Sequence, residues 1–163
     1  MPETYRVEVE KEAMIFSAAH FITFGEEICE SLHGHNYGVK VEIEGPLNRH
    51  AYVVDFIALR DEMIRLTRQL DHKVLLPESH PTIRVVVQGE EVVAKFQNRR
   101  WIFPRDNCVL LPITNTTAEL LASYLGGALL RWLREDHRAA FHRVRVSVDE
   151  NQGQWGVWEW TDR

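Results

Sequence analysis

Three histidines in two short motifs constrain the fold of this chain most strongly. His20 ends the apolar run FSAAH, and His33 and His35 stand two residues apart in HGH. In an extended strand such residues point to the same face, so His33 and His35 can bind one ion together. His20 would then come from a neighbouring strand. Three neutral imidazoles leave one position of a tetrahedral Zn²⁺ open, which is typical of a catalytic rather than a structural site.

Cys29 lies four residues before His33 and is the next candidate for chemistry. A thiol beside a metal ion and imidazoles has its thiolate stabilised, so it can act as a general base at neutral pH. It could instead be a fourth zinc ligand, which would make a closed structural site of one cysteine and three histidines. The spacing allows both roles. The other cysteine, Cys108 in NCVLLP, is expected to be a buried apolar residue.

Apolar and polar residues alternate in four segments that we predict to be β-strands, and two further segments have helical spacing. The strands are expected at residues 5–21, 37–44, 143–148 and 155–160. Asp55 stands at the N-cap position of the first helix, which is expected to end near Leu70. Thr116 and Glu119 form a capping-box pattern at the start of the second. This order predicts an α+β fold, a four-stranded antiparallel sheet with two helices on one face.

Residues 78–112 do not belong to that minimal pattern. IRVVVQ and EVVAKF flank Gly89-Glu90, which predicts a β-hairpin, and RRWIF and CVLL predict further short strands. The segment could simply extend an edge of the sheet or an oligomer contact. It could instead be a lid over a binding site, with Arg99, Arg100 and Arg105 facing phosphate groups.

Size and charge narrow the class of protein. A chain of 163 residues that is 45% hydrophobic can bury one core, so we expect a single domain over residues 1–163. A net charge of −5 argues against a general partner such as nucleic acid or a membrane surface. The N-terminus is charged, and no stretch is long and apolar enough to cross a bilayer, so a cytoplasmic location is expected.

Taken together, the motifs resemble those of the 6-pyruvoyltetrahydropterin synthase superfamily. They are F-S-A-A-H, C-x3-H-G-H-N-Y, V-D-F at the start of a helix and L-D-H at its end, and the resemblance covers residues 5–76 and 113–160. The C-x3-H-G-H spacing is most similar to 6-carboxytetrahydropterin synthase of queuosine biosynthesis. The resemblance implies the tunnelling fold, in which subunits close their sheets into a barrel as a homotrimer and two trimers often stack into a homohexamer.

The same resemblance implies roles for the candidate residues. Zn²⁺ would be held by His20, His33 and His35, and Cys29 would be the general base. Asp71 and His72 would complete a proton relay with Cys29 from the neighbouring subunit. Glu150 would accept hydrogen bonds from the pterin ring, and Thr117 would contact it. The remaining histidines are expected to be solvated: His50, His80, His137 and His142.

The implied activity is that of a zinc-dependent lyase converting 7,8-dihydroneopterin triphosphate to 6-carboxy-5,6,7,8-tetrahydropterin. One alternative product is 6-pyruvoyltetrahydropterin, although the longer Cys–His spacing of that branch is absent here. Another is 6-hydroxymethyldihydropterin for folate synthesis, because Glu30, three residues before HGH, resembles the signature of that branch. A third alternative is a non-catalytic, zinc-stabilised oligomeric binding protein, in which Cys29 ligates zinc or is inert.

Overall fold

The computed structural model describes residues 3–162, and its centre is one long strand, β5 (His33–Gly45). The first part of β5 pairs with β2 (Phe16–His20) and the second part with β1 (Tyr5–Glu10). It also pairs with β11 (Arg143–Asp149), which pairs in turn with β12 (Trp155–Thr161). All of these pairings are antiparallel. The predicted antiparallel core is therefore present, but the first expected strand is divided by a 3-10 turn, η1 (Glu12–Met14).

The prediction of four strands is wrong in extent, because the main sheet has seven. Strand β6 (Lys73–Pro77) lies parallel to β2, and β10 (Cys108–Leu111) lies parallel to β6. Strand β6 has the sequence KVLLP, a short continuous apolar run without alternation. Such a run is typical of a strand covered on both faces and gives no period-two signal. The sheet is therefore mixed, and residues 73–77 and 108–111 extend it.

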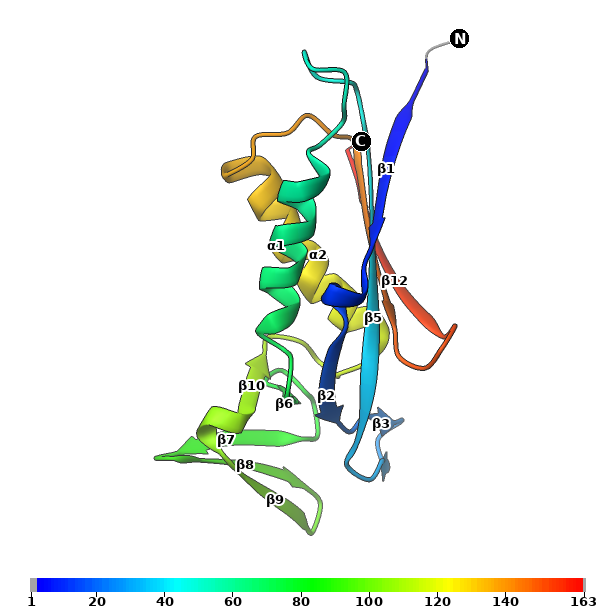
Figure 1. Cartoon of the computed structure of the whole chain (residues 1–163). Helices are drawn as coiled ribbons and strands as arrows, with labels where there is room; N and C mark the ends of the chain where they lie inside the picture. Colours follow the sequence, from blue (N-terminus) through cyan, green and yellow to red (C-terminus); the bar gives the residue numbers. More distant parts are fainter. Residues whose placement is uncertain (1–2, 163) are drawn as a thin grey trace.

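Both helices pack on the same face of the sheet, as predicted (Figure 1). Helix α1 (Phe56–Arg68) lies against β1 and η1, and α2 (Ala118–Glu135) lies against β11 and β12. The side chain of Asp55 accepts hydrogen bonds from the first turn of α1, which confirms it as the N-cap. The main core lies between these layers. Among residues 3–162, no helix is long and apolar enough to span a membrane.

The N-cap of α2 is Thr117, so the predicted capping box at Thr116 is wrong by one residue. The hydroxyl oxygen of Thr117 accepts a hydrogen bond from the backbone N–H of Leu120 at 3.4 Å. Thr116 is fully buried, and its hydroxyl donates to the carbonyl of Phe21 at 3.3 Å. Two adjacent threonines give the same sequence signal, and the contact with the end of β2 decides which one caps the helix.

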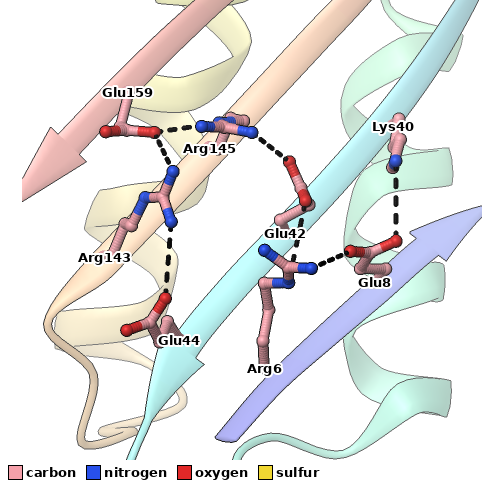
Figure 2. Close-up of polar contacts among 8 residues, drawn as sticks. All are labelled: Arg6, Glu8, Lys40, Glu42, Glu44, Arg143, Arg145 and Glu159. Carbon is pink, nitrogen blue, oxygen red and sulfur yellow. Dashed lines mark hydrogen bonds and ion pairs between the residues drawn. The ribbon is translucent and has the colours of Figure 1, made fainter. Parts of the chain in front are cut away.

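The other face of the sheet carries a network of ion pairs (Figure 2). On β5, Lys40, Glu42 and Glu44 alternate with apolar residues that face the helices. Glu42 is at the centre, 3.1 Å from Arg145 and 3.8 Å from Arg6. The network comprises Arg6, Glu8, Lys40, Glu42, Glu44, Arg143, Arg145 and Glu159. This charged face is unsuited to an apolar layer, which is why both helices lie on the opposite side.

The insertion forms a second sheet beside the first. Strands β7 (Arg84–Gln88), β8 (Glu91–Phe96) and β9 (Arg99–Pro104) are antiparallel, with the predicted hairpin turn at Gly89, whose φ is +59°. A 3-10 turn, η2 (Arg105–Asn107), leads back to β10. A small hydrophobic core lies under this sheet: Phe21, Cys29, Leu76, Ile83, Val92, Ala94, Phe96 and Cys108. Cys108 is thus buried as expected, and the insertion packs against the segment that carries Cys29.

The expectation that four histidines are solvated is only half right. His50 and His142 are exposed, whereas His80 and His137 are partly buried. The ring of His137 stacks on Trp132 at 4.7 Å between centroids. The Nδ1 atom of His80 accepts hydrogen bonds from two backbone N–H groups, and its Nε2 lies 2.8 Å from the hydroxyl of Thr23. Their polar sequence neighbours gave no sign of these tertiary contacts.

Two adjacent glycines in α2 provide a test of the helix–sheet packing. A methyl group at Gly126 would collide with the indole of Trp158 on β12, whereas one at Gly127 would meet no atom within 4 Å. We expect Gly126→Ala to lower the free energy of unfolding by about 1–3 kcal/mol through overpacking. Gly127→Ala should raise it by up to about 1 kcal/mol through helix propensity. Urea unfolding of both variants measures the difference, and equal effects would contradict the described packing.

Candidate active site

Pairing of β2 with β5 brings the three histidines of the two motifs together. His20 lies directly opposite His33 in the antiparallel register, and His35 follows on the same face of β5. One potential ligand atom of each ring lies within 4.8 Å of those of the other two. The neighbouring strand therefore does supply His20, as the sequence indicated, and the cluster could hold a metal ion.

The ring nitrogens of this cluster are suited to binding a cation. The Nδ1 atoms of His20 and His33 lie 2.8 Å from the backbone carbonyls of Thr116 and Ser31, respectively. With Nδ1–H donating to a carbonyl, the lone pair of Nε2 is free to bind a metal. Within residues 3–162, the buried Nε2 atoms of His20 and His35 have no hydrogen-bond partner. Burial lowers the pKa of His20 to about 4, so this imidazole is neutral at neutral pH.

Two carboxylates flank the histidines. The Oε2 atom of Glu30 lies 3.8 Å from Nε2 of His33 and accepts a hydrogen bond from the backbone N–H of Ile22 at 3.1 Å. The Oε1 atom of Glu150 lies 3.7 Å from Nε2 of His35. The site therefore has a carboxylate on each side, and either could attract a proton from a ligand bound near the histidines.

Cys29 lies beside this site but faces a different environment. It belongs to a short hairpin of β3 (Thr23–Phe24) and β4 (Ile28–Cys29), and its thiol is buried in the small core under the insertion. Burial raises the pKa of this thiol, while the nearby guanidinium of Arg99 acts in the opposite direction. Within the described chain, the potential metal-binding group contains the three histidines and not Cys29.

Asp71 and His72 follow α1 and form a hydrogen-bonded pair. The Nδ1 atom of His72 lies 2.9 Å from Oδ2 of Asp71, whose Oδ1 accepts from the backbone N–H of Ser17 at 2.8 Å. The bond from Ser17, and then the contact with His72, lower the pKa of Asp71. The side chain of His72 is 83% exposed. Among residues 3–162, neither side chain of the pair forms a hydrogen bond with Cys29.

Thr117 and Glu150 line one pocket of about 340 Å³ between the start of α2 and the end of β11. The hydroxyl oxygen of Thr117 already caps α2, so its hydroxyl hydrogen and its backbone are what it can offer a ligand. Glu119 and Gln154 line the same pocket. The structure thus brings together the two residues that the sequence analysis assigned to a flat, hydrogen-bonding ring.

The neighbouring carboxylate, Asp149, is used by the turn that joins β11 to β12. Its Oδ1 atom accepts hydrogen bonds from the backbone N–H groups of Asn151, Gly153 and Gln154. The side chain of Glu150 has no such role and lies beside the histidines. Of these two adjacent carboxylates, Glu150 is therefore the one that is available to a ligand in this pocket.

Comparison with known proteins decides the family. The model of the 6-pyruvoyl tetrahydropterin synthase family matches residues 8–159. The chain belongs to this family. A relative from Methanocaldococcus jannaschii is 32% identical over 140 residues, which are 85% of this chain and 85% of that protein. A relative from Pyrococcus abyssi is 34% identical over 137 residues, 82% of this chain and 80% of that one. Both are provisionally named 6-carboxy-5,6,7,8-tetrahydropterin synthase.

Solved structures agree with the family assignment. The 6-pyruvoyltetrahydropterin synthase of Plasmodium vivax superposes with a TM-score of 0.89 at 27% identity, covering 99% of this chain and all of that one. Two further structures of that protein carry substitutions, to Ala and to Cys, of a glutamate described as a catalytic residue. The α+β fold of the present chain, with two helices and a mixed sheet, is thus that of a tetrahydropterin synthase.

Two further features of this synthase site were not predicted from the sequence. Tyr37 lies on the same face of β5 as His35 and is fully buried, and its hydroxyl has no hydrogen-bond partner within residues 3–162. Burial raises its pKa, so the phenol is protonated. The run HGHNY contains the signal, because Tyr37 continues the i, i+2 series. Arg99 contacts the carbonyl of Cys29 at 2.8 Å, a contact that no local pattern indicates.

Proposed function

We propose that this tetrahydropterin synthase is a zinc-dependent lyase acting on 7,8-dihydroneopterin triphosphate. The observation that carries the proposal is the set of three imidazoles whose potential ligand atoms lie within 4.8 Å of one another, with Glu150 beside His35. Neutral imidazoles with one open position suit a catalytic Zn²⁺. When bound, the ion would polarise the side-chain oxygens of the substrate and acidify the neighbouring C–H. His20, His33 and His35 would hold it.

Other side chains would bind the pterin ring and transfer the proton. The carboxylate of Glu150 would accept two parallel hydrogen bonds from the 2-amino group and adjacent ring N–H of the pterin. The hydroxyl or backbone of Thr117 would contact the ring from the other side of the pocket. Cys29, four residues before the metal motif, would take the proton from the substrate side chain. Asp71 would orient the imidazole of His72 for passing that proton on.

The product we propose is 6-carboxy-5,6,7,8-tetrahydropterin, the queuosine-pathway intermediate. Loss of triphosphate and cleavage of the side chain, with uptake of one water molecule, would release acetaldehyde and leave the 6-carboxyl group. The spacing of Cys29 from His33 and the relatives from Methanocaldococcus jannaschii and Pyrococcus abyssi support this product. Incubation of zinc-loaded protein with 7,8-dihydroneopterin triphosphate tests it, with release of inorganic triphosphate as the first readout.

A second candidate reaction rests on Glu30. Its carboxylate lies 3.8 Å from His33, whereas the thiol of Cys29 is buried in an apolar cluster that raises its pKa. A carboxylate base would favour cleavage to 6-hydroxymethyldihydropterin, the folate-branch product. The Plasmodium vivax structures, in which a glutamate is described as catalytic, support a carboxylate in the catalytic role. Both reactions begin from the same substrate, so the two candidates differ in the base and the product.

We also propose that the active unit is a homotrimer or homohexamer of the tunnelling type. The support is the exposure of His72, whose side chain is 83% exposed while its partner Asp71 is fixed to the backbone of Ser17. A neighbouring subunit would supply the pair to Cys29. The charged sheet face in Figure 2 would then line the interior of the barrel.

Glu150→Gln is expected to weaken binding of pterin analogues about tenfold or more, because an amide donor would face the ring's own donors. Zinc content should be unchanged. Asp149→Asn keeps a side-chain oxygen for the β11–β12 turn and should bind nearly as wild type. Calorimetric titration with a non-hydrolysable pterin measures both. If Asp149 rather than Glu150 controlled affinity, the pocket described here would not be the pterin site.

A further inference from the structure

A hydrogen bond from the insertion reaches the peptide group between the two candidate bases. The Nη2 atom of Arg99, the first residue of β9, donates to the carbonyl oxygen of Cys29 at 2.8 Å. That carbonyl belongs to the peptide group between Cys29 and Glu30. Its position therefore affects the placement of the thiol and of the carboxylate at once.

The hairpin that carries Cys29 has little structure of its own. Strands β3 and β4 pair over two residues each, and the turn between them is exposed, with Gly25 at φ +60°. A two-stranded hairpin is at best marginally stable by itself in water. Phe24 and Ile28, which could have packed on a core, are 54% and 62% exposed. The position of this hairpin must therefore come from contacts with other elements.

Arg99 is itself held by two aromatic side chains. Its guanidinium carbon lies 5.5 Å from the ring centroid of Phe96 and 5.2 Å from that of Trp101. Trp101 stacks on Phe21 at 4.6 Å between centroids and an interplanar angle of 19°. Phe21 directly follows His20 of the metal cluster. The contacts thus form a continuous series from the β2 histidine through the insertion to the Cys29 carbonyl.

We infer that Arg99 is a positioning residue, which fixes the Cys29–Glu30 peptide relative to the histidine cluster, and that the β7–β9 sheet serves to place it. The catalytic part of this inference rests on the proposed function. It gives Arg99 a different role from that of a phosphate-facing lid residue. Arg100, the next residue, points to the opposite face of β9 by strand alternation and has no part in the series.

Thiol labelling tests the position of the peptide without any need for turnover. In a Cys108→Ser background, Cys29 is the one remaining cysteine, and 5,5′-dithiobis(2-nitrobenzoate) reports its exposure. Arg99→Met keeps the aliphatic stem but removes the donors, so labelling should become about tenfold faster as the hairpin loosens. Arg99→Lys retains a donor and should be intermediate. Arg100→Met removes the same charge from the same strand and should label at the rate of the Cys108→Ser parent.

Steady-state kinetics tests the catalytic part. With the bases displaced, Arg99→Met should lower kcat about tenfold while leaving KM and zinc content near the parent values. Arg99→Lys should restore part of kcat. Labelling of Arg99→Met at the parent rate would overturn the inference, and so would faster labelling with unchanged kcat. If the parent itself turned over no pterin, the proposed function would fail, while the labelling rates would still decide whether Arg99 positions the hairpin.

Discussion

His33→Ala is expected to remove most of the bound zinc and to lower turnover of 7,8-dihydroneopterin triphosphate by on the order of 10²-fold or more. His33 pairs directly with His20 across β2 and β5, and its Nδ1 atom is oriented by the carbonyl of Ser31. Loss of this imidazole leaves two ligands, which hold a divalent ion far more weakly than three. Elemental analysis of purified protein and a turnover assay measure the two effects together.

His142→Ala is the matched control for that experiment. His142 is exposed and lies outside the histidine cluster, so its removal should leave zinc content and turnover unchanged. Full retention of zinc by the His33 variant would contradict the assignment of the metal site. Parallel losses in both variants would show that the assay reports general damage rather than loss of a ligand.

The second large effect separates the two candidate bases. Cys29→Ala should keep zinc but lose on the order of 10²-fold or more in formation of 6-carboxytetrahydropterin, because a base acts in the chemical step. Glu30→Gln keeps the size of the side chain and should reduce formation of 6-hydroxymethyldihydropterin by a similar factor. Quantification of both pterins by mass spectrometry from each variant shows which residue is the base for which product.

The zinc content of the same two variants distinguishes loss of a base from loss of a metal ligand. Neither Cys29 nor Glu30 belongs to the three-histidine group, so both variants should carry as much zinc as the wild type. Loss of zinc in Cys29→Ala would instead support a closed site with four ligands. Unchanged yields of both products in both variants would eliminate Cys29 and Glu30 as bases.

Local patterns predicted the parts of this fold that local forces determine. Alternation located β5, β11 and β12, and the short polar side chain of Asp55 located the start of α1. The histidine cluster was predictable for the same reason, since residues two apart share a strand face and β2 pairs with the start of β5. Tertiary contacts then decided what the patterns left open, namely Thr117 over Thr116 as the helix cap and β6 as a strand of the sheet.

The arrangement around Cys29 was beyond sequence reasoning for a related physical reason. Spacing before HGH allows Cys29 to be a base, a ligand or neither, because a hairpin of two-residue strands does not set its own orientation. Tertiary contacts hold it instead, among them those with the insertion through Arg99 and a core that includes Phe96. Contacts across 70 residues leave no periodic signal in the chain.

Mass identification of the pterin formed from 7,8-dihydroneopterin triphosphate distinguishes the proposed product from its alternatives. Zinc-loaded wild-type protein should convert the substrate to 6-carboxy-5,6,7,8-tetrahydropterin with equimolar acetaldehyde and inorganic triphosphate. If 6-hydroxymethyldihydropterin were the sole product, Glu30 rather than Cys29 would be the base. Recovery of unchanged substrate from protein that carries one zinc ion per subunit would contradict the account and support a non-catalytic zinc-binding protein.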